Sequence, residues 1–295
     1  MLNKDSSAGG ACCALLIVSC DAYEDLWTPF LTLLKRHWGD CPFPVYLGAG
    51  KLHNDEEDVT VVRSDGGRDW SKCLRDYLGQ IPHEYVLMML DDFFLRKAVP
   101  TADVLYCLEF ARNEKAVQVR LIPHPGPTDR LSGDDLIGEC ASGLPYRLSA
   151  QGAIWNRLKL FELLRVGESI WEFEHNGNAR INERSHGFYC TWRAVLPYQG
   201  FFGHHVVEKG KWIPQEKWIF GRKDIGCDFR RRGTLAWGQT LFYYAVGILD
   251  RMLQIFSWQR KARIKRQIKC LLMPFLHKQF ARMSGTTSAS SKGRD

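Results

Sequence analysis

The stretch Tyr85-Val-Leu-Met-Met-Leu-Asp-Asp-Phe-Phe-Leu95 decides the fold class of this chain. Its apolar run from Tyr85 to Leu90 has the length of a buried strand and ends abruptly in Asp91 and Asp92. Open α/β sheets bind ligands beyond the carboxyl ends of their parallel strands. Two neighbouring carboxylates repel each other there unless a cation lies between them, and hard divalent ions take oxygen ligands. The stretch therefore predicts a strand that carries acidic groups to a metal and phosphate site. A solvated Asp-Asp turn between two core segments is the alternative.

Strand and helix patterns alternate on both sides of this stretch. Apolar runs predict further strands at 12–19, 44–47, 59–62, 117–122 and 201–207, with an edge strand at 146–150. Apolar residues at helical spacing predict helices at 25–38, 70–78, 101–113 and 154–164. This alternation predicts an α/β fold, with a Rossmann-like, mostly parallel central sheet flanked by helices.

The composition is that of a globular protein in a reducing compartment. Hydrophobic residues make up 45% of the 295 residues, and the ten cysteines form no Cys-x-x-Cys pair, which excludes zinc-ribbon and thioredoxin spacing. Residues 1–10 lack the basic start and apolar core of a signal peptide. No run reaches the ~20 apolar residues that a membrane-spanning helix requires. We therefore expect a cytoplasmic protein.

The positive charge is concentrated at the end of the chain. Residues 251–295 hold 11 Lys and Arg against one acid, so the rest of the chain has a formal charge of −3 out of the total of +7. Six of these cations lie between Arg260 and Lys269, interleaved with apolar residues at helical spacing. This pattern predicts a basic amphipathic helix on an anionic membrane surface. A pair of helices packed on the body, or on a second copy, is the alternative.

Five short motifs follow one another along the chain. They are Ser19-Cys-Asp-Ala-Tyr-Glu-Asp-Leu-Trp27, Asp69-Trp-Ser71, Leu90-Asp-Asp-Phe-Phe94, Gln151-Gly-Ala-Ile-Trp155 and Trp171-Glu-Phe-Glu174. In this order they resemble bacterial surface-polysaccharide glycosyltransferases (those of O-antigen or capsule) with the GT-A fold, over roughly residues 12–215. The Asp-Asp pair stands where that family has an Asp-x-Asp metal motif. Because the spacer is missing, the sequence leaves open which carboxylate contacts the metal.

The resemblance implies a nucleoside diphosphate sugar donor and a divalent cation, Mn²⁺ or Mg²⁺. The metal ligands would be Asp92, Asp91 and His205, although a histidine with a purely structural role is the alternative for the last. Contacts to the nucleotide would come from six residues: Ser19, Asp21, Tyr23, Arg68, Trp70 and Asp91. For Asp21 a helix cap is an equal alternative, and for Trp70 packing in the core is the better one.

Acceptor activation requires a base opposite the leaving group if the configuration inverts. A carboxylate whose pKa is raised by apolar neighbours suits this task. Glu172 and Glu174 are the candidates, and Glu172 is preferred because it matches the acidic position of the family most closely. The alternative is a pair formed by a helix-capping Glu and a solvated Glu. Gln151 and Trp155 would line the sugar pocket, with Trp155 as a stacking surface.

These expectations combine into one hypothesis: a metal-dependent, inverting glycosyltransferase, peripheral on the inner face of the cell membrane. It would act on a glycan acceptor, and the resemblance implies a lipid-linked one. Residues 1–220 would form the catalytic domain. Residues 221–283 would be the membrane-association region, with its basic part 251–283 on the anionic surface. Residues 284–295 would be a disordered tail.

A non-catalytic membrane-surface or nucleotide-binding scaffold of the same fold is the alternative. Nucleic acid is not expected as a partner, because the body is acidic and its aromatic residues lie in apolar runs. The sequence leaves the donor sugar, the acceptor and the oligomeric state open.

Overall fold

The computed structural model describes residues 12–54, 56–143, 146–181, 186–198, 205–238 and 240. Contacts between residues divide the chain into two units, Met1–Ala236 and Trp237–Asp295. The first unit continues past the predicted domain boundary at 220 because the segment that ends at Leu235 packs on it. The predicted amphipathic helix and the predicted disordered tail lie outside the described residues. Among the described residues, no helix is long and apolar enough to cross a membrane.

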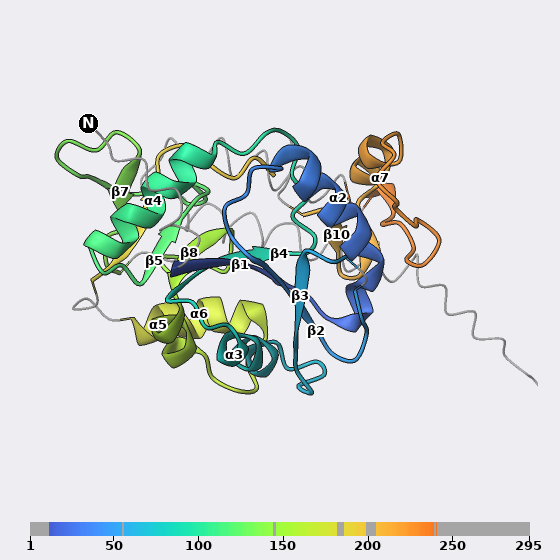
Figure 1. Ribbon diagram of the computed structural model, residues 1–295, viewed down its shortest axis with the longest axis horizontal. Coiled ribbons are helices and arrows are strands. Elements are labelled where there is room, and N and C mark those ends of the chain that lie inside the picture. Colours follow the sequence, from blue (N-terminus) through green and yellow to red (C-terminus); the bar gives the residue numbers. More distant parts are fainter. Residues whose placement is uncertain are drawn as a thin grey trace, which may run out of the picture. The chain divides into compact units, whose positions relative to one another are not determined.

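A central sheet of nine strands forms the middle layer of the first unit (Figure 1). Its spatial order is β3-β2-β1-β4-β8-β5-β9-β7-β6. The strands are β1 (Cys13–Val18), β2 (Val45–Ala49), β3 (Val59–Arg63), β4 (Tyr85–Leu90), β5 (Gln118–Arg120), β6 (Asp129–Arg130), β7 (Ile137–Glu139), β8 (Ala153–Asn156) and β9 (Phe188–Thr191). Only β8 and β7 run against the others among these nine. The predicted α/β fold with a mostly parallel sheet is thus confirmed.

Helices cover both faces of the sheet (Figure 1). On one side lie α2 (Trp27–His37), which continues the 3₁₀ helix η1 (Asp21–Leu26), and α4 (Thr101–Asn113). On the other side lie α3 (Trp70–Gln80), α5 (Arg157–Leu163) and α6 (Ile170–Arg180). Strand β1 explains the two layers, because its alternate residues enter two separate hydrophobic clusters. A small hairpin of β10 (Val207–Glu208) and β11 (Lys211–Trp212) precedes α7 (Pro214–Phe220).

Two local predictions were wrong, and both concern the segment around β8, the strand next to β4. Residues 146–150 form no strand, and the predicted helix 154–164 begins only at Arg157. The apolar residues before it form β8, which inserts antiparallel between β4 and β5. Periodicity cannot distinguish a short buried strand with three apolar residues from one helical turn, so the sheet decides its conformation. Of the predicted strand at 201–207, residues 201–204 lie outside the described part.

Strand β3 forms one edge of the sheet, and a side chain closes part of that edge. The amide of Gln80 accepts a hydrogen bond from the N–H of Arg63 at 2.9 Å and donates one to its carbonyl at 2.6 Å. These bonds replace the pairing that a further strand would give to the last residue of β3.

Candidate functional site

The candidate site lies where the carboxyl ends of β1 and β4 meet. The two strands are parallel neighbours, and Val18 pairs with Leu90. From β1 the chain proceeds to β2 on one side, and β4 then joins β1 on the other side. This is the topological switch point, where open α/β sheets form a crevice for ligands. The residues that follow the two strands, Ser19 and Asp91, therefore lie side by side.

Asp91 is buried and held in place by hydrogen bonds. Its carboxylate accepts a short hydrogen bond from the Ser19 hydroxyl, and that hydroxyl in turn accepts one from the indole N–H of Trp27 at 2.6 Å. Burial, together with the neighbouring charge of Asp92, raises the pKa of Asp91 well above its ordinary value. Ser19, predicted to contact the nucleotide, thus orients Asp91.

Asp92 is partly exposed and lies beside the segment that leads into β10. Its carbonyl accepts a hydrogen bond from the N–H of Val206 at 2.9 Å. Burial raises the pKa of the Asp92 carboxyl to about 6, although the nearby His205 opposes this shift. The His205 ring lies 2.9 Å from Glu208, and this contact, with the charge of Asp92, raises the pKa of His205 against the effect of burial. The three predicted metal ligands therefore lie in one electrostatic neighbourhood, with Glu208 as an unpredicted member.

The chemistry of these side chains suits a hard cation shared with a phosphate. Mg²⁺ is typically bound in proteins by one or two carboxylates, waters and substrate phosphates rather than by a complete protein cage. Asp92 and Asp91 can supply the carboxylate oxygens. No group of three or more His, Cys, Asp or Glu side chains arranged for a metal occurs within the described ranges. The phosphate oxygens of a ligand would have to complete the coordination.

Arg232 is a member of the site that sequence reasoning missed. Its guanidinium is 8% exposed, forms a two-point ion pair with Asp25 and donates to the carbonyl of Ala22 at 3.1 Å. It also lies over the ring of Tyr23, 4.5 Å from the ring centre. Its charge counteracts the rise in pKa of Asp91 and Asp92. The signal in the sequence was the run of arginines at 230–232, which lies within the predicted membrane-association region 221–283.

Asp21 and Tyr23 lie on η1 but face different surroundings. The carboxylate of Asp21 accepts hydrogen bonds from the N–H groups of Gly50 at 2.7 Å and Lys51 at 2.8 Å. Burial alone would raise the pKa of Asp21, but these bonds outweigh it and lower the pKa. Asp21 thus ties η1 to the loop after β2, a structural role that differs from the helix cap given as its alternative. Tyr23 is half-buried, next to Arg232 and the two aspartates. Burial and the charges of Asp92 and Asp91 raise the pKa of Tyr23, while Arg232 opposes this rise.

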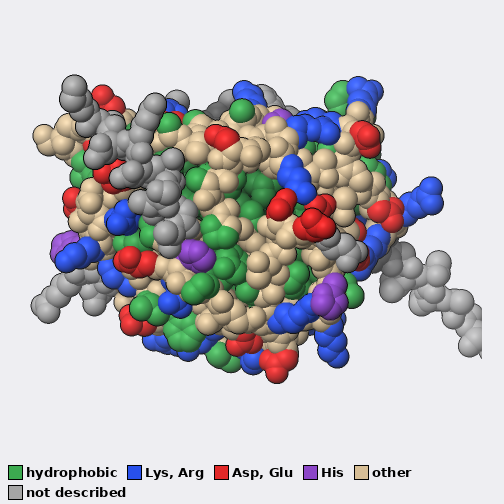
Figure 2. Space-filling view, in the orientation of Figure 1, with side chains coloured by type: hydrophobic (Ala, Val, Ile, Leu, Met, Phe, Trp, Pro, Cys, Tyr) green, Lys and Arg blue, Asp and Glu red, His purple; other side chains and the backbone are tan. Residues whose placement is uncertain are grey.

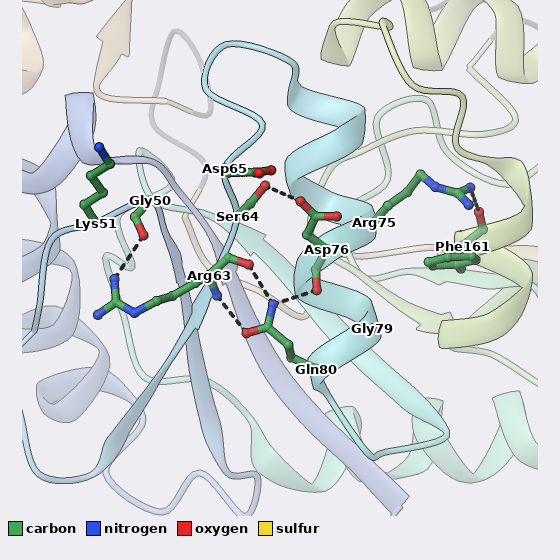
Figure 3. Close-up of a pocket in the computed structure, with 10 residues that line it drawn as sticks. All are labelled: Gly50, Lys51, Arg63, Ser64, Asp65, Arg75, Asp76, Gly79, Gln80 and Phe161. Carbon is green, nitrogen blue, oxygen red and sulfur yellow. Dashed lines mark hydrogen bonds between the residues drawn. The ribbon is translucent and has the colours of Figure 1, made fainter.

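An open groove of about 660 Å³ lies next to the loop that Asp21 holds (Figure 3). It runs between the carboxyl ends of β2 and β3 and helix α3, and its charged lining residues are Lys51, Arg63, Asp65, Arg75 and Asp76. Arg63 donates to the carbonyl of Gly50 at 3.0 Å, while Ser64 donates to Asp76 at 2.5 Å. The groove therefore has a framework of fixed polar groups on the side of the sheet where β1 and β2 end.

Arg68 and Trp70 flank the start of α3. Arg68 is exposed, whereas the ring of Trp70 packs on Phe173 with 5.4 Å between ring centres. The packing alternative therefore describes Trp70 better than a nucleotide contact. Between them, Asp69 caps α3 through the N–H of Lys72 at 2.9 Å and also binds the N–H of Gly167 at 2.7 Å.

Glu172 and Glu174 lie on different faces of helix α6. Glu172 is exposed and forms a capping box with Ser169, and the hydrogen bonds from Ser169 lower its pKa. The preference for Glu172 as a base is therefore corrected: it is the capping Glu. Glu174 faces the sheet and accepts from the Ser149 hydroxyl at 2.8 Å and the Ala150 N–H at 2.7 Å. Burial raises the pKa of Glu174 despite these bonds.

Gln151 lies at the candidate site, but Trp155 does not. Met88 pairs antiparallel with Ala153, so the segment before β8 passes the carboxyl end of β4. Gln151 lies on that segment, and its side-chain oxygen is buried without a hydrogen-bond partner among the described residues. Trp155 is 0% exposed and packs near Phe173 in the core. A sugar cannot reach it, which corrects the prediction that Trp155 lines the sugar pocket.

Comparison with known proteins places the chain far from characterised sequences. No family model matches it, and no curated protein matches it. Among solved structures, residues 1–349 of TarS from S. aureus are 13% identical, with a TM-score of 0.40, over 61% of this chain and 60% of that chain. The TarS complex with UDP is 13% identical, with a TM-score of 0.39, over 83% of this chain and 72% of that chain. The bifunctional IspDF from Campylobacter jejuni is 13% identical, with a TM-score of 0.34, over 60% of this chain and 52% of that chain. The match thus spans about 60% of the length of the first of these structures, and function has to be argued from the site.

Proposed function

We propose that this protein is a glycosyltransferase that moves a sugar from a nucleoside diphosphate sugar to a hydroxyl group of a glycan. The observation that carries the proposal is the Asp91-Asp92 pair at the switch point of the sheet. One carboxylate is buried and fixed by Ser19, and the other is partly exposed next to His205. This arrangement suits a divalent cation that is shared with a diphosphate.

The donor diphosphate would lie over the ends of β1 and β4. Asp92, with Asp91 behind it, would hold Mn²⁺ or Mg²⁺, and His205 is positioned to join them. The cation would supply Lewis-acid stabilisation for the charge that develops on the departing diphosphate. Arg232 adds a fixed positive charge on the same side, beside Tyr23. The nucleoside would lie in the groove next to Gly50 and Lys51, at the adjoining part of the same edge.

Glu174 would activate the acceptor. Its carboxylate would take the proton from an acceptor hydroxyl while that oxygen attacks the anomeric carbon and the nucleoside diphosphate leaves. Attack from the side opposite the leaving group would invert the configuration. The raised pKa of Glu174 and its contact with the Ser149–Ala150 segment, which leads to Gln151, support this role.

The basic segment 251–283 supports a lipid-linked acceptor at the inner face of the cell membrane. Each cation near an anionic leaflet contributes about 1 kcal/mol, so the six between Arg260 and Lys269 would hold the enzyme there. A chain that lacks 251–295 should lose its binding to vesicles of anionic phospholipid in sedimentation. Undiminished binding of the truncated chain would refute this part of the proposal.

Calorimetric titration with UDP and GDP, with and without Mn²⁺, tests the site. We expect metal-dependent binding of one nucleotide by the wild-type chain and by Asp58→Asn, an exposed residue before the amino end of β3. Asp92→Asn should abolish it. Failure of both nucleotides to bind in any metal condition would overturn the proposal. Metal-dependent binding with no transfer from any of a panel of nucleoside diphosphate sugars would instead favour the non-catalytic scaffold.

A further inference from the structure

Two buried cysteines and a buried arginine lie together on the face of the sheet covered by α6, and the proposed reaction uses none of them. Gly138 of β7 pairs with Cys190 of β9, and the N–H of Cys140 donates to the carbonyl of Phe188 at 2.9 Å. Cys140 and Cys190 are therefore diagonal neighbours on one face of adjacent strands. Both belong to the same hydrophobic cluster.

Arg120 reaches this pair from the end of β5. Its Nη2 donates to the sulfur of Cys140 at 3.2 Å and its Nη1 to the carbonyl of His124 at 3.2 Å. Its Nε has no hydrogen-bond partner among the described residues. Arg147 donates to the carbonyl of Cys140 at 2.8 Å. A guanidinium that is 1% exposed requires a nearby anion, because an unpaired buried charge is costly.

Cys140 is well placed to be that anion. The neighbouring Cys190 thiol and the guanidinium of Arg120 lower the pKa of Cys140 to about 6, against the effect of burial. Burial raises the pKa of Cys190 well above the ordinary value, so it remains a protonated thiol, which donates to the carbonyl of Ile122 at 3.4 Å. One thiolate and one thiol are therefore neighbours beside a fixed cation, and a lowered thiol pKa next to a second cysteine is a property of reactive cysteines with a resolving partner.

We propose that Cys140 and Cys190 are a site of oxidation by hydrogen peroxide and form a reversible disulfide. The Cys140 thiolate attacks one oxygen of the peroxide, the O–O bond breaks, and the departing hydroxide takes up a proton to become water. Cys140 is then a sulfenic acid. The sulfur of Cys190 attacks the sulfur of Cys140 and loses its proton, the S–O bond breaks, and a second water leaves. In total, two thiols are oxidised and one peroxide is reduced to two waters.

The burial of the two cysteines limits the size of the oxidant that can reach them. Cys140 is 3% exposed and Cys190 is 0% exposed, so only a molecule close to water in size can reach the sulfurs without unfolding. Peroxide meets this condition, whereas glutathione disulfide does not. Disulfides in a reducing compartment are typically transient and serve redox sensing, and this pair has the chemistry for such a use.

Oxidation would also change the charge around Glu174, a consequence that rests on the proposed function. Arg120 interacts electrostatically with both Cys140 and Glu174. When the thiolate becomes part of a disulfide, its negative charge no longer offsets the positive charge of Arg120, which then acts fully on the Glu174 carboxylate. The pKa of Glu174 should then fall, and the acid limb of the pH–activity profile should move to lower pH.

The test is peptide mapping of the full-length chain by mass spectrometry after brief exposure to peroxide, followed by alkylation in denaturant. We expect a linked pair of peptides that contain Cys140 and Cys190, lighter by two hydrogens and separated by dithiothreitol. Cys73→Ser, which removes a buried thiol from α3, should form the same link, and Cys190→Ser should not. The same dose of glutathione disulfide should leave both thiols free.

The pH dependence of the reaction gives a readout that requires no variant. Formation of the link should be half-maximal near pH 6, whereas an ordinary thiol reaches this point near its pKa of about 8.5. Arg120→Gln should slow the link at pH 7 at least about fivefold. Free thiols at both positions after peroxide, or oxidation confined to other cysteines, would overturn the proposal. The assay measures mass rather than activity, so it can fail or succeed independently of the proposed transferase function.

Discussion

Glu172 and Glu174 are two residues apart in the sequence but lie in opposite environments on α6. A helix separates them by about 200°, so one meets solvent and the other meets the segment before β8. Sequence reasoning preferred Glu172 because it matches the acidic position of the family that the chain resembles, and it treated the pair as sharing one face of a strand or extended turn. The difference gives a matched pair of substitutions for the proposed reaction.

Glu174→Gln should lower kcat by about 10²- to 10⁴-fold, the usual contribution of a general base, without weakening nucleotide binding. Glu172→Gln removes only a helix cap and should leave kcat within about threefold. For the proposed reaction of the wild-type chain, kcat should fall as pH drops through the raised pKa of Glu174, at a higher pH than for an ordinary Glu, because the base must be ionised. The rate of nucleotide release measures kcat, and calorimetry measures nucleotide binding. Equal losses in both variants would contradict the assignment.

Asp92 predicts a pH dependence of stability. Its pKa is raised from 3.8 to about 6, so the folded state binds the proton more tightly than the unfolded state. The free energy of unfolding should therefore fall as pH rises from about 4 to about 6, by roughly 1–3 kcal/mol for this partly exposed group. Asp92→Asn should remove this decline, and Asp58→Asn should keep it. Urea denaturation at pH 4.5 and pH 7 measures the difference; identical profiles for wild type and Asp92→Asn would contradict it.

At the scale of elements, β2 packs closely on α3 through a glycine. A Cβ added at Gly48 would lie 2.4 Å from Cε2 of the buried Tyr77 ring. Gly48→Ala should therefore cost about 1–3 kcal/mol of unfolding free energy, since the ring and strand must move apart. Gly79→Ala on the same helix has open space around it and should stabilise by up to about 1 kcal/mol. Urea denaturation of both variants checks this; two equal effects would show that the contact is not tight.

Strong local patterns were predictable from the sequence, and contacts between distant segments were not. The apolar run 85–90 and the helix at 101–113 match β4 and α4 in their bounds. Strand β8 was mistaken for part of a helix, because only its neighbours β4 and β5 determine its conformation. The carboxylates at 91 and 92 could be placed at the end of a strand. The fixation of Asp91 by Ser19 and Trp27 depends on two strands far apart in the sequence.

At the scale of the whole molecule, the segment around Arg232 returns to the first helical segment of the chain. The carboxylate of Asp25 is 3% exposed, and Arg232 is its ion-pair partner. Arg232→Met would leave this charge buried and unpaired, at a cost of about 3–5 kcal/mol. The double variant Arg232→Met, Asp25→Leu should regain most of this loss. Arg231→Met removes an exposed pair with Glu24 and should cost under about 1 kcal/mol. Chemical denaturation measures the unfolding free energies of the three variants. A double variant as unstable as Arg232→Met would argue against the buried pair.

Positive and negative side chains are intermixed on one face of the protein. On the face drawn in Figure 2, Lys and Arg side chains alternate with Asp and Glu rather than forming one basic surface. A duplex nucleic acid requires a continuous array of cations, so this face offers no such interface. The excess of positive charge belongs to residues 251–295.

The amide that Gln80 presents to Arg63 has a consequence for self-association. Open sheets are prone to grow by recruiting a strand from another copy, because their outermost strand offers unpaired N–H and carbonyl groups. Here the side chain occupies the last of these groups on β3, and the opposite border ends in β6, which is two residues long. Neither border offers a long template. Copies of this protein that meet should therefore associate through side chains, and the sheet should not continue from one copy into the next.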